Sequence, residues 1–241
     1  MEGGPVKELF ISVLGKPAGI VLFQLLDATQ FTIYLSLIAF GGGGLIGLLI
    51  TALRVTPLKP LQRIGTAYVW LFQSVPLLML LFLLGLGIPR LSGVSVDPWT
   101  AAALALTLYT SAYLVEVWYG AIKAIPAGQM EGGKALGMTL PQILLLIILP
   151  QAARLAIAPT IGFLVQIIKG TSLAYIIGFQ DLMTTGKRWA NAPVPGTQPF
   201  IIYPLMAMIY FALCFPLSIL SRRLEKRLGS PGAKARVTAS A

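Results

Sequence analysis

Apolar stretches long enough to cross a lipid bilayer constrain this chain of 241 residues more than any other feature. A membrane-spanning helix needs about 20 mostly apolar residues. Only 11% of the residues are charged, against about 25% in a soluble domain. We therefore predict an all-α, polytopic membrane protein with five transmembrane helices. The five segments are 31–53, 64–88, 99–122, 155–179, which carries Lys169, and 199–220.

The residue types that this chain lacks exclude several classes of protein. It has no histidine and one cysteine, Cys214, which excludes an internal disulfide framework and a hydrolase that depends on histidine. The same composition argues against a zinc or iron site. No lysine follows the longest glycine run, 41–44, and no Gly-x-x-x-x-Gly-Lys-Ser/Thr phosphate loop is present. We expect no metal and no ATP bound by this chain.

Basic residues are distributed unevenly between the two sides that five spans define. Twelve lysines and arginines lie on the side that holds the C-terminus, and five lie on the other. Because lysine and arginine accumulate on the cytoplasmic side of membrane proteins, we expect the N-terminus outside and the C-terminus in the cytoplasm. This bias accounts for most of the net charge of +10, so no nucleic-acid partner is needed to explain it.

The two ends of the chain differ from the membrane region between them. Residues 9–26 mix apolar and polar types and have charges on both flanks, which favours an amphipathic helix at the membrane interface over a cleavable signal peptide. We therefore expect an N-terminal periplasmic or interfacial helix, 1–28, a transmembrane domain, 29–228, and a flexible cytoplasmic tail, 229–241.

A short uncharged stretch, 138–150, lies in the cytoplasmic loop that this topology predicts between spans three and four. As a helix of 13 residues it is about 20 Å long, too short for about 30 Å of hydrocarbon. Thr139 is a favourable N-cap before Pro141, and Pro150 is expected to end the helix. The glycines and single acid just before it, around Glu131, suggest a surface on which a cytoplasmic partner docks.

The residues of this loop resemble a motif of the integral subunits of binding-protein-dependent ABC importers. That motif is Glu-Ala-Ala, three residues, Gly, nine residues, then Ile, one residue, and Leu-Pro. The chain keeps the spacing, with glycine in place of both alanines. The resemblance extends over 25–228 and is similar to the polar amino acid (histidine, glutamine or glutamate) branch. The matching residues are Glu131, Gly132, Gly133, Gly137, Ile147, Leu149 and Pro150.

The resemblance implies a type I ABC importer permease fold with a cytoplasmic coupling-helix loop, in the bacterial inner membrane. It implies a homodimer or a heterodimer with a sister permease, two cytoplasmic ATPase subunits that bind ATP and Mg²⁺, and a periplasmic amino-acid-binding protein. This chain itself would catalyse no bond change. The alternative for Glu131 is a solvated loop acid, and for Gly137 a helix C-cap. The implied ATPase-docking residues are Glu131, Gly132, Gly133, Ala135, Leu136 and Gly137.

Lys169 is the one basic residue well inside a predicted span. An intramembrane charge usually faces a cavity or a partner, so Lys169, followed by Gly170, Thr171 and Ser172, is a candidate for the substrate path. The alternative is a lysine that extends its ammonium group to the membrane interface. Many relatives have Asp after this lysine, and Gly170 in its place favours neutral or acidic amino acids over cationic ones.

Two further polar residues in predicted spans are candidates for the substrate path. Glu116 is interpreted as a pathway or dimer-interface acid, with Lys169 as one possible partner, or as an acid at the cytoplasmic interface. Gln73 lies where relatives often carry arginine, and its uncharged amide does not inherit that role. Pro76, three residues later, is expected to kink the second span.

Two other classes of function remain alternatives. A stand-alone secondary amino acid transporter would use Glu116 and Lys169 as coupling groups, but five spans without an internal inverted repeat count against it. A structural membrane scaffold would need no functional charge inside the membrane. Co-purification of an ATPase subunit would separate the importer from both.

Overall fold

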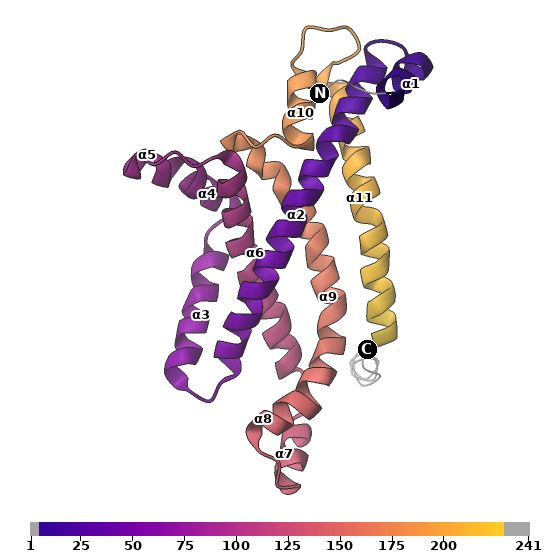
Figure 1. Cartoon of the computed structure of the whole chain (residues 1–241). Helices are drawn as coiled ribbons and strands as arrows, with labels where there is room; N and C mark the ends of the chain where they lie inside the picture. Colours follow the sequence, from indigo (N-terminus) through magenta and orange to yellow (C-terminus); the bar gives the residue numbers. More distant parts are fainter. Residues whose placement is uncertain (1–4, 229–241) are drawn as a thin grey trace, which may run out of the picture. The chain divides into compact units, whose positions relative to one another are not determined.

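The computed structural model describes residues 5–228, which contain helices and no strand (Figure 1). This confirms the predicted all-α class. The α-helices are α1 Pro5–Leu14, α2 Ala18–Val55, α3 Lys59–Ser74, α4 Leu77–Phe82, α5 Ile88–Ser92, α6 Pro98–Lys123, α7 Ala127–Ala135, α8 Leu140–Ile143, α9 Leu149–Gly170, α10 Leu182–Ala190 and α11 Pro199–Leu228. Two π-helical turns, η1 Leu83–Gly87 and η2 Leu144–Ile148, and a 3₁₀-helix, η3 Thr171–Ile177, connect some of them.

Four helical runs in the described part of the chain are long and apolar enough to cross a membrane: Ala18–Val55, Pro98–Lys123, Leu140–Ile177 and Pro199–Leu228. The remaining predicted span, 64–88, which is the second in the chain, is a broken pair, because α3 ends at Ser74 and α4 begins at Leu77. Pro76 has an extended ψ of 139°. Proline lacks an N–H and disfavours helix in the residue before it, so the predicted kink is a complete break.

The single helix expected over residues 9–26 is interrupted in the structure, and its expected place at the membrane interface stays a prediction. The chain forms α1, turns at Gly15 with a φ of +72°, and begins α2 at Ala18. Residues 18–30 therefore belong to the same helix as the predicted span 31–53. The expected domain boundary at residue 28 falls inside α2, and the division into 1–28 and 29–228 stays a prediction. The expected tail, 229–241, lies outside the described residues.

The expectation that Pro150 ends a short helix is wrong. The helical run continues from Leu140 through Pro150 to Ile177. Immediately before the proline, the N–H of Leu149 donates to the carbonyl of Leu144, five residues back, in the wide turn η2. In a regular α-helix, proline removes one backbone hydrogen bond and its ring clashes with the carbonyl four residues earlier. The wide turn η2 changes the backbone hydrogen-bond pattern at this point. The stretch 138–150 is thus the beginning of a long helix.

The same arrangement occurs before Pro89. There the N–H of Ile88 donates to the carbonyl of Leu83 at the end of η1, and α5 continues through the proline. In both places the proline stands two residues after the last residue of the π-helical turn. Single π-helical turns inside α-helices are rare and often lie at functional sites, and in this chain both accommodate a proline.

The described residues form two compact units that interrupt one another along the chain. The first comprises 5–41, 75–108 and 166–215, and the second comprises 42–74, 109–165 and 216–228. In the first unit, helix α4 packs against η3, and α10 packs against η3 as well. Its main apolar cluster consists of Val21, Leu25, Leu182, Ala190, Ile202, Met206 and Ile209.

The second unit brings the cytoplasmic loop of the predicted topology together with parts of the predicted spans. Helix α7 packs against α8 and η2, and Figure 1 shows α7 beside α8. A cluster of small residues, Ala121, Ala152 and Ala156, joins α6 to α9, with Trp118 packed against it. Alanine side chains allow two helices to approach closely, so these helices are fixed near the loop.

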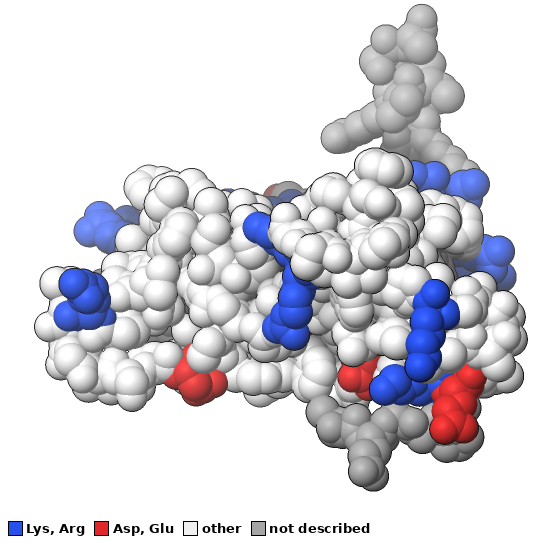
Figure 2. All heavy atoms as spheres, turned by 90° about the horizontal axis from the view of Figure 1, so that it is seen from above, with Lys and Arg blue, Asp and Glu red and all other residues white. Residues whose placement is uncertain are grey.

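The surface of the described helices is largely apolar. Leu45 and Leu49 of α2 are each 68% exposed, and Phe200 of α11 is 75% exposed. Charged side chains are few on the face shown in Figure 2, where uncharged residues make up most of the visible surface. Exposed apolar area costs about 25 cal/mol per Å² in water, whereas hydrocarbon solvates it. The surface agrees with a protein that spans a bilayer.

Candidate coupling and transport site

Helix α7 ends in a turn that requires glycine. The N–H of Met138 donates to the carbonyl of Gly133 at 3.1 Å, and the N–H of Gly137 donates to that of Lys134 at 2.9 Å. Gly137 has a φ of +74°. This is the Schellman pattern of a helix C-terminus, in which a left-handed residue is usually glycine. Gly137 thus has the geometry of the helix C-cap that was the alternative to docking, and its part in docking stays a prediction.

The second glycine of the motif fixes the position of α7. Gly133 is buried, and a Cβ added there would lie 2.7 Å from Cγ1 of Ile143, which is fully buried itself. The amides of Gln151 and Gln129 are hydrogen-bonded at 3.1 Å. The N–H of Thr139 donates to Oε1 of Gln142 at 2.8 Å, which confirms Thr139 as the N-cap. Helix α7 is therefore packed firmly against α8.

The opposite face of α7 is open. Glu131, Gly132 and Ala135 are exposed, and Leu136 is 80% exposed. A Cβ at Gly132 would have no atom within 4 Å. Within residues 5–228, Glu131 takes part in no ion pair. This face presents a carboxylate without an ion-pair partner beside an exposed leucine, on a helix fixed from behind, which suits a protein–protein contact.

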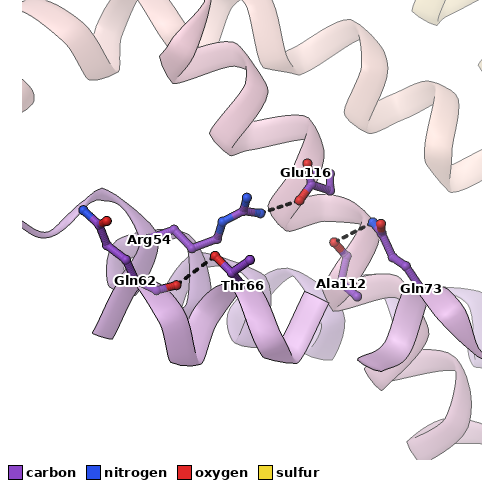
Figure 3. A network of polar contacts seen from close by, with 6 residues as sticks. All are labelled: Arg54, Gln62, Thr66, Gln73, Ala112 and Glu116. Atoms are coloured by element: carbon purple, nitrogen blue, oxygen red, sulfur yellow. Dashed lines mark hydrogen bonds and ion pairs between the residues drawn. The ribbon is translucent and has the colours of Figure 1, made fainter. Parts of the chain in front are cut away.

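Glu116 forms an ion pair that sequence reasoning missed. Its Oε1 pairs with Nη1 of Arg54, in the last turn of α2 (Figure 3). The guanidinium of Arg54 also lies 4.0 Å from the ring centroid of Tyr119. Arg54 lies just after the predicted span 31–53, and Lys169 was the partner that the sequence suggested for Glu116. The two residues are 62 positions apart in the chain, and no local pattern connects them.

Gln73 contributes to the attachment of α3 to α6. Its Nε2 donates to the carbonyl of Ala112 at 3.3 Å (Figure 3). Five residues earlier on α3, the hydroxyl of Tyr68 lies 2.6 Å from that of Ser111. The sequence predicted Gln73 as a substrate-path residue, and the structure gives its amide a contact with the backbone of a neighbouring helix.

Lys169 lies in the last turn of α9 and is exposed. The α-helix ends at Gly170 and continues as the 3₁₀-helix η3. The hydroxyl of Thr171 donates to the carbonyl of Ile168 at 2.8 Å, and that of Ser172 donates to the carbonyl of Lys169 at 2.6 Å. Both hydroxyl protons are therefore used within the chain. Thr171 is also fully buried, so Ser172 has the more accessible side chain of the two.

Gly170 permits a close helix contact in the first unit. A Cβ at this position would lie 3.2 Å from Cδ2 of Leu77. Glycine at this position therefore allows tight packing between α9 and α4. A larger residue would require Leu77 to move.

Asp181 is a buried acid that sequence analysis did not single out. It is the N-cap of α10, and its Oδ1 accepts the N–H of Thr184 at 2.9 Å. Its Oδ2 is buried and has no hydrogen-bond partner among the described residues. Burial raises the pKa of Asp181 from 3.8 to about 6, against the opposing effect of the Thr184 hydrogen bonds.

Replacing Asp181 with asparagine is expected to stabilise the protein at pH 8. The folded protein binds this proton more tightly than the unfolded chain, so the associated stability is complete below pH 3.8 and is lost as pH rises through about 6. Because the pKa rises by about two, ionisation of Asp181 lowers the free energy of unfolding by about 3 kcal/mol. Asparagine keeps the cap and cannot ionise. Thermal unfolding of the purified protein should show a higher Tm for the variant at pH 8, with the gap closing towards pH 4.

Asp97 provides the matched control for this prediction. It also precedes a helix, but it is exposed, and the Thr100 hydroxyl and backbone N–H lower its pKa. Asp97→Asn should therefore not raise the Tm at pH 8. An Asp181→Asn gain that is the same at pH 4 and pH 8 would contradict the assigned cause.

An open pocket of about 400 Å³ lies in the second unit among α2, α6 and α9. Leu48, Trp118 and Ala156 are among its lining residues, which are apolar except for Thr51 and Thr160. It contains no ionisable side chain. A charged or zwitterionic ligand would lose its hydration there without compensation, so this pocket is not a candidate binding site for an amino acid.

Known proteins match most of this chain. Residues 43–230 match the family described as "Binding-protein-dependent transport system inner membrane component". The probable glutamine ABC transporter permease protein GlnM of Bacillus subtilis (strain 168) is 35% identical over 203 residues, covering 84% of this chain and 92% of the relative. The L-cystine transport system permease protein TcyB of the same organism is 33% identical over 204 residues, covering 85% and 86%.

Solved structures share the fold. A crystal structure of an amino acid ABC transporter with histidines matches with a TM-score of 0.78 and 27% identity, over 85% of this chain and 94% of that one. An inward-facing MetNI methionine ABC transporter matches with a TM-score of 0.72 and 20% identity, over 86% and 97%. The chain has the ABC importer permease fold and belongs to the family of inner membrane components of binding-protein-dependent transport systems.

Proposed function

We propose that this chain is the permease subunit of an ATP-driven importer that moves polar amino acids across the bacterial inner membrane. The observation that carries the proposal is α7. It is packed from behind by Gly133 on Ile143 and presents Glu131 to the outside. A helix that is firmly packed and has an exposed carboxylate can bind a cytoplasmic partner and transmit the partner's movement to the spans. The relatives named as glutamine and cystine permeases support the substrate class.

The proposed complex contains several other chains. Two ATPase subunits dock on α7 and bind ATP with Mg²⁺, because this sequence has no phosphate loop. A periplasmic binding protein delivers the amino acid, and a second permease, identical or a sister chain, completes the membrane part. The N-terminus is outside and the C-terminus is in the cytoplasm, in keeping with the positive-inside bias.

The proposed mechanism is alternating access. Closure of the ATPase subunits on ATP moves α7, which is joined to α6 through residues 124–126 and to α8 through the turn at Gly137. Since α7 is packed on α8 rather than loosely tethered, its displacement is passed to both helices. The spans then open outward to receive the amino acid, and ATP hydrolysis restores the inward-facing state.

Lys169 is proposed as a substrate-path residue that meets the carboxylate of the amino acid. It is exposed, and within residues 5–228 no ion pair holds it. Lys169→Met should lower uptake roughly fivefold, mainly through a higher KM. A hydrogen bond to a charged group contributes about 1.5–3 kcal/mol to binding, and water that hydrates the substrate carboxylate in the variant recovers part of this free energy. Uptake kinetics in proteoliposomes measure both constants.

Lys59→Met is the control, since Lys59 is also exposed and starts α3. If Lys169→Met keeps the wild-type KM and rate, the lysine only anchors the helix at the membrane interface, and the substrate path lies elsewhere.

The substrate class is tested by competition. Proteoliposomes with the complete complex should take up a labelled polar amino acid, and unlabelled neutral or acidic amino acids should compete better than arginine or lysine. If only cationic amino acids compete strongly, the preference for neutral or acidic amino acids that was inferred from Gly170 is wrong. No competition by any amino acid would refute the proposed substrate class.

A further inference from the structure

Arg54 connects three helices of the second unit at their predicted cytoplasmic ends. Its guanidinium pairs with Glu116 and lies over the ring of Tyr119. These two residues are three positions apart on α6 and so lie on the same face of the helix. The Arg54 side chain is 11% exposed and that of Glu116 is 45% exposed. One largely buried cation therefore binds two positions that are about one turn apart on α6.

Helix α3 encloses Arg54 from another side. A Cβ at Gly65 would lie 2.8 Å from Cγ of Arg54 and 3.3 Å from the carbonyl oxygen of Ile50. Glycine at this position lets the α3 backbone lie directly against the aliphatic part of the arginine. The arginine side chain is thus held by α3 on its stem and by α6 at its head (Figure 3).

The polar contacts between the α2–α3 hairpin and α6 follow one another along α6. Tyr68 contacts Ser111, Gln73 contacts Ala112, and Arg54 contacts Glu116 and Tyr119. The Arg54 contacts are therefore the ones closest to Lys123, where α6 ends. Only residues 124–126 separate that end from α7.

This order gives the Arg54 contacts a mechanical position. A displacement of α7 acts first on the last turns of α6, where Glu116 and Tyr119 lie. If Arg54 holds the α2–α3 hairpin at these turns, the hairpin moves together with α6. Without the Arg54 contacts, α6 moves alone. An ion pair in a partly buried setting is stronger than the same pair in water, and removal of one partner leaves the other charge uncompensated.

We propose that Arg54, Glu116 and Tyr119 form a clasp that makes the α2–α3 hairpin follow α6 when α7 moves. The three are positioning residues, and the proposal rests on the proposed function as an ATP-driven permease. The clasp couples the ATPase cycle to the spans without touching substrate or ATP. Glu116 then has a role distinct from that of a substrate-path acid.

Breaking the clasp from either side should uncouple transport. Arg54→Gln and Glu116→Gln, each in the complete complex in proteoliposomes, should raise the ATP hydrolysed per amino acid taken up roughly tenfold, with unchanged KM. The double variant should be no worse than Arg54→Gln alone, because that single variant already removes the contacts of Arg54 with both Glu116 and Tyr119. The charge exchange Arg54→Glu with Glu116→Arg should restore part of the coupling.

Arg63→Gln is the matched control, since Arg63 is an exposed arginine on α3 that forms no ion pair within the described residues. Assembly is checked by size-exclusion chromatography. If Arg54→Gln does not assemble, Tyr119→Leu replaces it, because that variant keeps the ion pair and removes only the ring; it should uncouple more weakly in the same direction.

Three outcomes would overturn the clasp. They are a normal ATP-to-substrate ratio in an assembled clasp variant, no recovery on charge exchange, and a changed KM for Glu116→Gln alone, which would make Glu116 a substrate-path acid. Failure of the wild-type complex to show ATP-dependent uptake would instead count against the proposed function. The clasp and the function are therefore tested separately.

Discussion

Glu131→Lys is expected to reduce the amount of ATPase subunit that co-purifies with the permease about a hundredfold, and uptake with it. The Glu131 carboxylate is exposed and forms no ion pair within the described residues, so it is available to a basic group of a partner chain. Lysine there would bring a like charge to a basic partner group, and truncation or reversal of a charge pair at an interface costs about 2–5 kcal/mol. Quantitative pull-down from detergent extracts measures the loss.

The control for this prediction is Glu225→Lys, the same charge reversal at an exposed position on α11. Both variants should insert into the membrane at wild-type levels, because neither acid lies in the apolar core of a span. Normal assembly and normal uptake by Glu131→Lys would refute the docking role of α7.

Gly133→Val should lower assembly and uptake roughly tenfold, because overpacking of this kind costs about 1–3 kcal/mol. Its Cβ would lie 2.7 Å from Cγ1 of Ile143. Ile143 is fully buried and cannot move aside without disturbing α8. Helix α7 must therefore shift away from α8, and its exposed face shifts with it. Co-purification and uptake assays on the same preparations measure both effects.

Gly128→Val is the control on the same helix, since Gly128 is exposed, is not one of the docking residues, and would meet no atom within 4 Å with a side chain. It should assemble normally. Equal behaviour of Gly133→Val and wild type would show that α7 is not held in place by this contact.

The spans were predictable because a long apolar run has few alternatives in water or lipid. The predicted 99–122 differs from α6, Pro98–Lys123, by one residue at each end. The beginning of α2 was missed because Gln24 and Asp27 interrupt the apolar pattern. In the structure, Gln24 accepts the indole N–H of Trp189 at 2.8 Å, and Asp27 accepts an amide N–H of Gln30 at 3.1 Å. Polar groups with partners do not end a helix.

The error at Pro150 has a different physical origin. A local rule says that proline ends a helix, but the wide turn η2 supplies the alternative bond from Leu149 to Leu144. The sequence contains no signal for that turn that we can name. Pro89 likewise follows a π-helical turn, η1.

The position of the candidate docking site was predictable from the spacing of the motif residues along the chain. From the sequence alone, the motif places Glu131, Gly133 and Gly137 in one loop between two spans. It did not distinguish Gly133, which packs on Ile143, from Gly132, which is open. That distinction and the pairing of Arg54 with Glu116 depend on contacts between separate helices, which one sequence does not reveal.

The most direct test of the proposed function is uptake of a labelled polar amino acid into proteoliposomes that contain the permease, its co-purified ATPase subunit and the binding protein. The account predicts uptake that needs ATP on the ATPase side, needs the binding protein on the other side, and persists when ion gradients are abolished. Uptake by the permease alone, driven by a proton or sodium gradient and indifferent to ATP, would contradict it and identify a secondary transporter.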